Sequence, residues 1–237
     1  MPKPRPSTPR PSLTEDAAQE WVRPITRENL SDKAYAELRG ALMRGLLKPG
    51  AQLPLRPVSE RFGISATPMR EALTRLVVER ALVLDARGTV TVPRLTRDQL
   101  LEIRAIRVDL EGRCAERAAR LAGPEEVDAL DAVHREMMAA QARADFMGAI
   151  GQNTRFHLEL CRMGRLPITR ELVEGLWVRC GPLLTHLYDA GIPPDWDPHP
   201  HTRVIRALRA RDAAGARAAI RFDIENGGQG LLNHVAD

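Results

Sequence analysis

The chain has 237 residues, of which 43% are hydrophobic and 28% charged, with a formal net charge of +4. This composition is ordinary for a folded protein and excludes wholesale disorder. No run approaches the ~20 apolar residues that cross a bilayer, and residues 1–10 lack the apolar core of a secretory signal. We therefore expect a cytoplasmic protein without a membrane segment, long enough for two modest domains.

The charge is distributed unevenly along the chain. Residues 1–97 carry 17 Lys and Arg against 10 Asp and Glu, whereas the remainder has a small acidic excess. A basic N-terminal part joined to a mildly acidic C-terminal part is typical of a nucleic-acid reader fused to a second domain.

The N-terminal elements begin after a segment rich in proline. Residues 1–24 contain Pro, Ser, Thr and Arg in a pattern that predicts a flexible tail. From Leu30, apolar residues recur at helical spacing as far as Leu46, and residues 48–50 then interrupt the pattern. A short helix over residues 57–62 ends at Gly63, and a further helix starts at Ser65.

After Arg80 the hydrophobic period changes from helical to two. Leu82 and Leu84, followed by Val90 and Val92, alternate around residues 85–88, which predicts a short β-hairpin. Two helices joined by a tight turn and followed by a hairpin form a winged helix-turn-helix. We assign this DNA-binding domain to residues 25–94.

Several residues of such a domain are placed to contact DNA. The second helix of such a pair enters the major groove by its N-terminal end, and its Ser65 can also cap the helix. An arginine before the short helix can contact phosphate, and the hairpin tip can approach the minor groove. For each arginine the alternative is an exposed side chain that only faces solvent. The predicted contacts are Arg56, Ser65, Ala66, Thr67, Arg70, Arg87 and Gly88.

Everything beyond Thr96 is helical in pattern. Breaks near residues 123–124, 164–167, 191–200 and 211–212 imply about six helices, so residues 95–237 are predicted to form an all-α bundle that binds an effector and dimerises. The three cysteines, Cys114, Cys161 and Cys180, are widely spaced within helical stretches and are expected to be reduced core residues. The fold class is therefore mainly α, with one small hairpin.

The quoted motifs resemble the GntR family of regulators. Gly-Leu-Leu-Lys-Pro-Gly over residues 45–50 and Gly-Ile-Ser-Ala-Thr-Pro-Met-Arg-Glu-Ala-Leu over residues 63–73 carry the N-terminal resemblance. Arg107 with Glu111, Asn-Thr-Arg-Phe-His over 153–157, residues 201–208 and residues 212–224 resemble the FCD-type effector domain of the FadR subfamily, in its shorter VanR-like form. The resemblance implies a homodimer, a palindromic DNA operator and a small organic acid effector. Family members often carry Arg where this chain has Ala66.

Four polar side chains are candidates for a divalent metal site. Asn153 and His157 share one helix face, His201 begins a helix, and Asp223 lies on the apolar stripe of the last helix. Such a set suits Zn, Ni, Mn or Fe. In the family's metal-binding members the position of Asn153 is usually Asp and the position of Asp223 is usually His, so this chain has its carboxylate on the last helix instead. The alternative is a group of hydrogen-bonded core residues.

The other histidines are expected to be ordinary surface or core residues, although His199 is an alternative ligand to His201. These histidines are His134, His186, His199 and His234.

Arg107 is the candidate effector-binding residue, because apolar residues repeat on its side of a long helix. A buried guanidinium needs an anion, which is either Glu111, one turn on, or an effector carboxylate. The sequence thus predicts a regulator controlled by an organic acid and not an enzyme. The alternatives are a metal-responsive repressor, or a metalloenzyme with two His and a carboxylate, which no catalytic motif supports.

Overall fold

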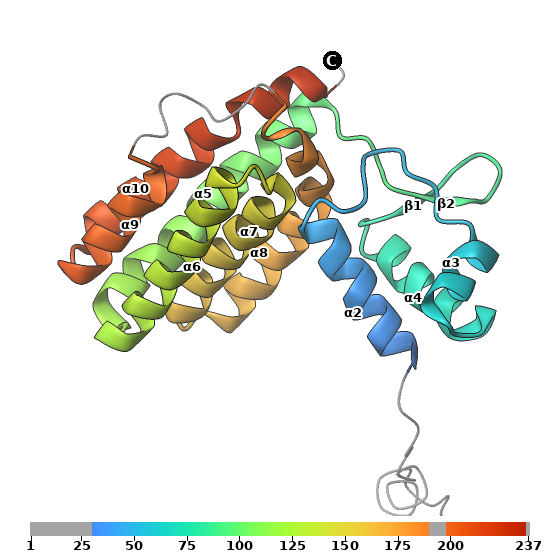
Figure 1. The fold of residues 1–237 in the computed structure, drawn as a ribbon, viewed down its shortest axis with the longest axis horizontal. Coiled ribbons are helices and arrows are strands. Elements are labelled where there is room, and N and C mark those ends of the chain that lie inside the picture. The colour runs from blue at the N-terminus through green and yellow to red at the C-terminus, as the bar shows by residue number, and fades with distance from the viewer. Residues whose placement is uncertain (1–29, 190–197, 236–237) are drawn as a thin grey trace, which may run out of the picture.

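The structure is a computed structural model that describes residues 30–189 and 198–235 (Figure 1). The tail predicted for residues 1–24 lies outside the described residues. Figure 1 shows a helical bundle on one side and a smaller module with the hairpin on the other, with α2 between them.

The smaller module is a winged helix-turn-helix, as predicted. Its helices are α2 (Leu30–Met43), α3 (Leu55–Phe62) and α4 (Ala66–Val78). Strands β1 (Val83–Leu84) and β2 (Val90–Thr91) pair antiparallel, with Val83 opposite Thr91 and Leu84 opposite Val90. The buried faces of α2 and α4 form its core together with Leu82 and Val92.

Glycines in the left-handed conformation end both α2 and α3. At Gly45 (φ +68°) the N–H groups of Gly45 and Leu46 donate to the carbonyls of Leu42 and Ala41, which is a Schellman motif. The prediction that the helix continues to Leu46 was therefore wrong, and Leu46 is 52% exposed. Gly63 (φ +64°) makes the tight turn between α3 and α4 in the same way.

The short helix before this turn begins earlier than predicted. It starts at Leu55 instead of residue 57, because a proline is tolerated in the first turn, where its missing N–H has no helical partner.

The C-terminal part is an all-α bundle with six helices in the described residues, close to the number predicted, although the break at residues 143–145 was not predicted. They are α5 (Arg97–Leu121), α6 (Pro124–Ala142), α7 (Phe146–Met163), α8 (Pro167–Cys180), α9 (Pro200–Arg209) and α10 (Ala213–Gly227). Among the described residues, two 3₁₀ turns accompany them, η1 (Gly181–His186) and η3 (Gln229–His234). The three cysteines are buried and free, as expected.

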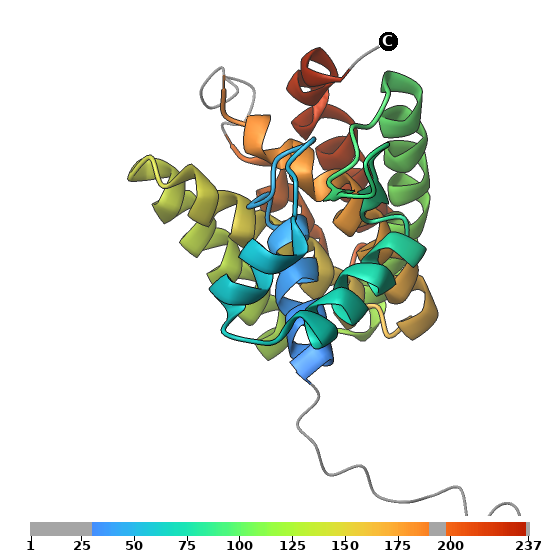
Figure 2. The same ribbon diagram turned by 90° about the vertical axis from the view of Figure 1, so that its right-hand side faces the viewer.

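The end of α2 docks directly on the bundle, and Figure 2 shows α2 in front of the bundle helices. Val178 of α8 belongs to the same apolar cluster as Leu42 of α2. The Thr154 hydroxyl of α7 donates to the Met43 carbonyl over 3.2 Å. A Cβ added to Gly181 would lie 2.3 Å from the Leu42 carbonyl oxygen, so the two backbones are in contact.

We expect Gly181→Ala to destabilise the full chain. The added methyl meets backbone atoms that cannot rotate away, which costs about 1–3 kcal/mol of the free energy of unfolding. Gly175→Ala in α8 is the matched control, because a Cβ there meets nothing within 4 Å and alanine favours a helix by up to about 1 kcal/mol. Urea unfolding of both variants measures the difference. Equal stability of the two variants would contradict the close contact.

Candidate functional site

The start of α4 presents the predicted DNA-reading residues to solvent. Ser65, Thr67 and Arg70 are exposed and Ala66 is half-buried, whereas Met69 points into the core. Ser65 occupies the N-cap position, but its hydroxyl makes no capping bond, so the expectation that it caps the helix was wrong. The exposed hydroxyl of Ser65 is therefore available to bind a molecule that contacts this surface.

The wing and the start of α3 carry the other predicted contacts. Arg56, Arg87 and Gly88 are exposed. The Asp85 carboxylate accepts from the backbone N–H groups of Arg87 and Thr89 over 2.9 and 2.8 Å, which orders the hairpin tip. These hydrogen bonds fix the backbone of the hairpin tip, on which Arg87 is exposed.

Arg75, on the same helix as Arg70, is tied to the body of the module. Its guanidinium forms an ion pair with Asp32 and lies 4.0 Å above the ring of Tyr35. Arg70 therefore differs from its neighbour, since no ion pair involving it is found among the described residues.

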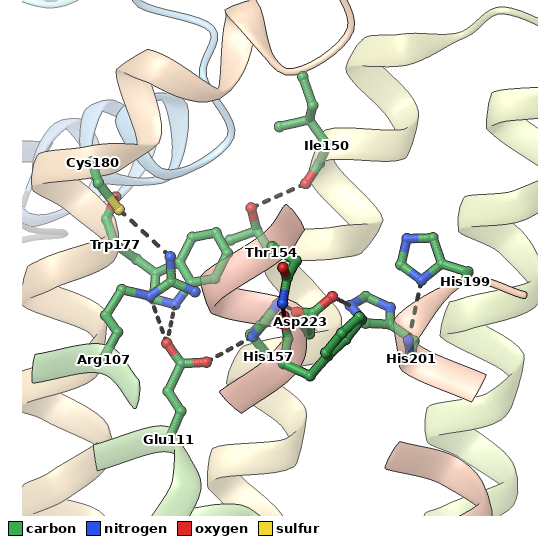
Figure 3. Close-up of polar contacts among 12 residues, drawn as sticks. Arg107, Glu111, Ile150, Thr154, His157, Trp177, Cys180, His199, His201 and Asp223 are labelled. Carbon is green, nitrogen blue, oxygen red and sulfur yellow. Dashed lines mark hydrogen bonds and ion pairs between the residues drawn. The ribbon is translucent and has the colours of Figure 1, made fainter. Parts of the chain in front are cut away.

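A line of buried ionisable side chains crosses the bundle (Figure 3). Arg107 Nε donates to Glu111 Oε1 over 2.6 Å, and Glu111 Oε2 lies 2.7 Å from His157 Nδ1. His157 Nε2 lies 3.1 Å from Asp223 Oδ2, and His201 Nε2 lies 3.7 Å from Asp223 Oδ1. Four helices, α5, α7, α9 and α10, thus meet through one polar chain.

The charges along this chain alternate. Burial would raise the pKa of Glu111, but Arg107 and His157 lower it to about 2. Burial would likewise raise the pKa of Asp223, but His201 and His157 hold it well below its usual value. Burial would lower the pKa of His157, and the two carboxylates raise it instead. Burial lowers the pKa of His201 at the end of the chain.

Glu111 is the anion that Arg107 meets in the structure. The guanidinium of Arg107 also lies 3.9 Å from the ring centre of Trp177, whose indole N–H donates to Glu111 over 3.2 Å. Arg107 as an effector-binding residue remains a prediction, because Glu111 already satisfies it. Trp177 was not singled out from the sequence, because its contact depends on α8 packing against α5.

A cavity of about 60 Å³ adjoins the polar chain, with room for several water molecules. Arg104, Arg107, Asn153, His157 and Asp223 line its polar side. Apolar residues line the rest, among them Leu100, Ile103, Leu184, Leu187 and Leu231.

Arg104 was missed from the sequence. Its Nη1 atom is buried and makes no hydrogen bond within the part of the chain that the structure describes. The signal was the spacing of Arg104 and Arg107, three residues apart on one helix face.

Three of the four proposed metal ligands come together. One ligand atom each from His157, His201 and Asp223 lies within 4.8 Å of the others, and all three residues are buried. Asn153 is half-buried and lines the adjoining cavity.

The donor set fits a divalent ion on two further observations. Glu111 holds Nδ1 of His157 and turns its Nε2 toward Asp223, as outer carboxylates do for metal-binding imidazoles. Neither ring nitrogen of His201 makes a hydrogen bond to the described residues.

Two histidines expected to be ordinary lie beside this set. His134 of α6 and His199, the residue before α9, are both buried, and their rings lie 5.6 and 4.4 Å from that of His201. The sequence offered only the proximity of His199 to His201, and His134 is distant in sequence from both.

The chain matches two family models. The model described as "Bacterial regulatory proteins, gntR family" matches residues 30–92, and "FCD domain" matches residues 102–226. No helix of the described residues is long and apolar enough to span a membrane.

Named relatives agree with these matches. The HTH-type transcriptional regulator McbR of Escherichia coli (strain K12) is 36% identical over 183 residues, which cover 76% of this chain and 83% of the relative. The HTH-type transcriptional repressor RspR of the same organism is 22% identical over 191 residues, covering 81% and 84%.

Solved structures show the same fold. E. coli McbR/YncC superposes with a TM-score of 0.82 at 32% identity, covering 88% of this chain and 99% of that one. A putative GntR regulator from Rhodococcus sp. RHA1 reaches 0.70 at 21% identity, covering 86% and 97%, and supports the fold alone. These families regulate transcription and are not enzymes, which sets the metalloenzyme alternative aside. The chain belongs to the GntR family of bacterial regulatory proteins and joins its DNA-binding winged helix-turn-helix to an FCD domain.

Proposed function

We propose that the chain acts in the cytoplasm as a homodimer on a palindromic operator, and that a small organic acid in the FCD cavity sets its affinity for DNA. The observation that carries this proposal is Arg104, which lines the cavity and whose buried Nη1 atom makes no hydrogen bond to the described residues. A buried guanidinium nitrogen without a hydrogen-bond partner favours a carboxylate ligand. The apolar wall of the cavity suits the carbon skeleton of such an acid.

The cavity is connected to the DNA-binding module by a short path. Cys180 and Leu184 line the cavity on either side of Gly181, and the Gly181 backbone contacts the end of α2. An acid that binds more tightly to the conformation with η1 in one position than to the conformation with η1 in another therefore shifts α2, and α4 with it. This differential affinity couples the effector to the operator.

A divalent ion, Zn, Ni, Mn or Fe, is part of this proposal. His157, His201 and Asp223 would hold it, with Asn153 at the cavity side, and the bound ion would supply a Lewis-acid contact for the acid. The chain's own groups orient that contact, because Glu111 fixes the ring of His157.

The test begins with selection of bound DNA from a random pool. A panel of carboxylic acids is then screened for a change in affinity for the selected operator. We expect Arg104→Gln to weaken binding of the active acid by about 1.5–3 kcal/mol, since a charge-assisted hydrogen bond is lost. Operator affinity without acid should not change.

Arg113→Gln is the matched control, because Arg113 is an exposed arginine of the same helix. Equal acid binding by both variants would contradict the role of Arg104. If metal alone changes operator affinity without any acid, the metal-responsive repressor is the better description, which the His157, His201 and Asp223 set would then explain.

A further inference from the structure

A second group of histidines lies next to the polar chain but outside the lining of the cavity. His134 of α6, His199 and His201 are 8%, 3% and 0% exposed. One nitrogen from each lies within 4.8 Å of the other two. Figure 3 shows His199 beside His201, on the side of that ring away from His157. Only His201 is common to both groups.

The rings are held in place by neighbours. Phe156 stacks on His201 with ring centres 3.7 Å apart and planes 5° from parallel. The Thr202 hydroxyl lies 3.3 Å from His134 Nε2. If this nitrogen carries the proton and donates to Thr202, the lone pair of His134 is on Nδ1, which is buried and makes no hydrogen bond to the described residues. An outer partner that fixes the ring and frees one nitrogen is the usual setting of a metal-binding imidazole.

His199 is held by the chain itself. Its Nδ1 accepts a hydrogen bond from the backbone N–H of His201 over 3.2 Å, at the first turn of α9. If His199 binds an ion through Nε2, its ring proton moves to Nδ1, and Nδ1 can no longer accept the hydrogen bond from the His201 N–H. The shared ion then connects His199 to His201 of α9 in place of that hydrogen bond. No net proton is released by this change.

We propose that His134, His199 and His201 form a second metal site, for a transition ion that prefers imidazole nitrogen, and that the ion joins α6 to the start of α9. Three neutral imidazoles suit Zn, Ni, Co or Cu, whereas Mg and Ca require oxygen ligands. The three side chains leave a fourth coordination position for water. The site is separate from the His157, His201 and Asp223 set in two of its three ligands.

The experiment titrates chelator-stripped full-length protein with Co²⁺ and records its visible absorption. His134→Gln and His199→Gln each remove one ligand of the second site alone, so we expect each to weaken this binding at least about 10-fold. His157→Gln should retain the Co²⁺ spectrum of a three-nitrogen site. His201→Gln should abolish binding at both sites.

Two controls accompany the titration. His186→Gln should leave the spectrum of the three-nitrogen site unchanged, because His186 belongs to a separate half-exposed cluster with Asp189 and His234. Thr202→Val keeps all three imidazoles but removes the outer hydrogen bond to His134, and should weaken binding by about 10–100-fold even if His134→Gln fails to fold.

The proposal is overturned if His134→Gln or Thr202→Val, with an unchanged circular dichroism spectrum, binds Co²⁺ as the wild type does. It is also overturned if the stripped wild type binds no Co²⁺, or if His157→Gln loses all binding. Since the readout is the Co²⁺ spectrum and not DNA affinity, failure of the effector proposal leaves this result intact.

Discussion

Arg70→Ala is expected to abolish operator binding at concentrations where the wild type is saturated. Arg70 is exposed near the start of the reading helix, where a side chain reaches base edges in the major groove. A lost bidentate contact costs about 1–3 kcal/mol, and a dimer loses it twice. Operator affinity should therefore fall by at least about 30-fold. Titration of labelled operator at fixed salt measures the change.

The control for this variant is Arg135→Ala. Arg135 is an exposed arginine on α6, in the bundle, and its removal lowers the net charge by the same amount. Circular dichroism and thermal unfolding of both variants should match the wild type. Unchanged operator affinity in Arg70→Ala would refute the assigned role, and an equal loss in Arg135→Ala would show that charge alone is responsible.

Glu111→Gln is expected to lower the free energy of unfolding by about 3–5 kcal/mol, because removal of one partner leaves a buried charge uncompensated. Glu111 is fully buried and accepts from Arg107 and Trp177 while it contacts His157. The amide keeps the shape of the side chain but removes the charge that faces Arg107. Urea unfolding at neutral pH checks the value.

Glu116→Gln on the same helix is the comparison. Its carboxylate pairs with Arg120 and Arg217 near the surface, where such pairs contribute at most about 1 kcal/mol. If Glu111→Gln does not fold, Arg107→Met combined with Glu111→Met should recover part of the stability, because neither charge is then buried alone. A loss as small as that of Glu116→Gln would contradict the ionised chain.

The elements of the fold were largely predictable because their hydrophobic periods are clear. The change from a helical to a two-residue period after Arg80 located the hairpin, and glycine and proline marked the breaks at residues 123–124 and 164–167. Residues 143–145, between α6 and α7, contain neither glycine nor proline, and this break was missed. The error at Leu46 has a local cause. Its apolar side chain continued the helical spacing, but Gly45 ends the helix one turn earlier by a conformation that spacing does not report.

The candidate site was predictable only where residues share a helix or a recognised motif. His157, His201 and Asp223 each lie on the inward face of their helix, and these faces meet. The burial of the Arg104 Nη1 atom and the contact of His134 with His199 depend on how α5, α6 and α9 pack. Such contacts join residues far apart in sequence, so no spacing rule could indicate them.

The docking of α2 limits how regulators of this kind can exchange their parts. Leu42 completes the core of the DNA-binding module together with Val178 of the sensor, and the next carbonyl accepts from Thr154. In a chimera with a different DNA-binding module, the end of the first helix must therefore pack against Val178 and fit closely against the Gly181 backbone. A module that does not fit leaves Val178 uncovered or brings its backbone too close to Gly181. New operator specificity is accordingly easier to reach by changing exposed residues of α4 than by transplanting the whole module.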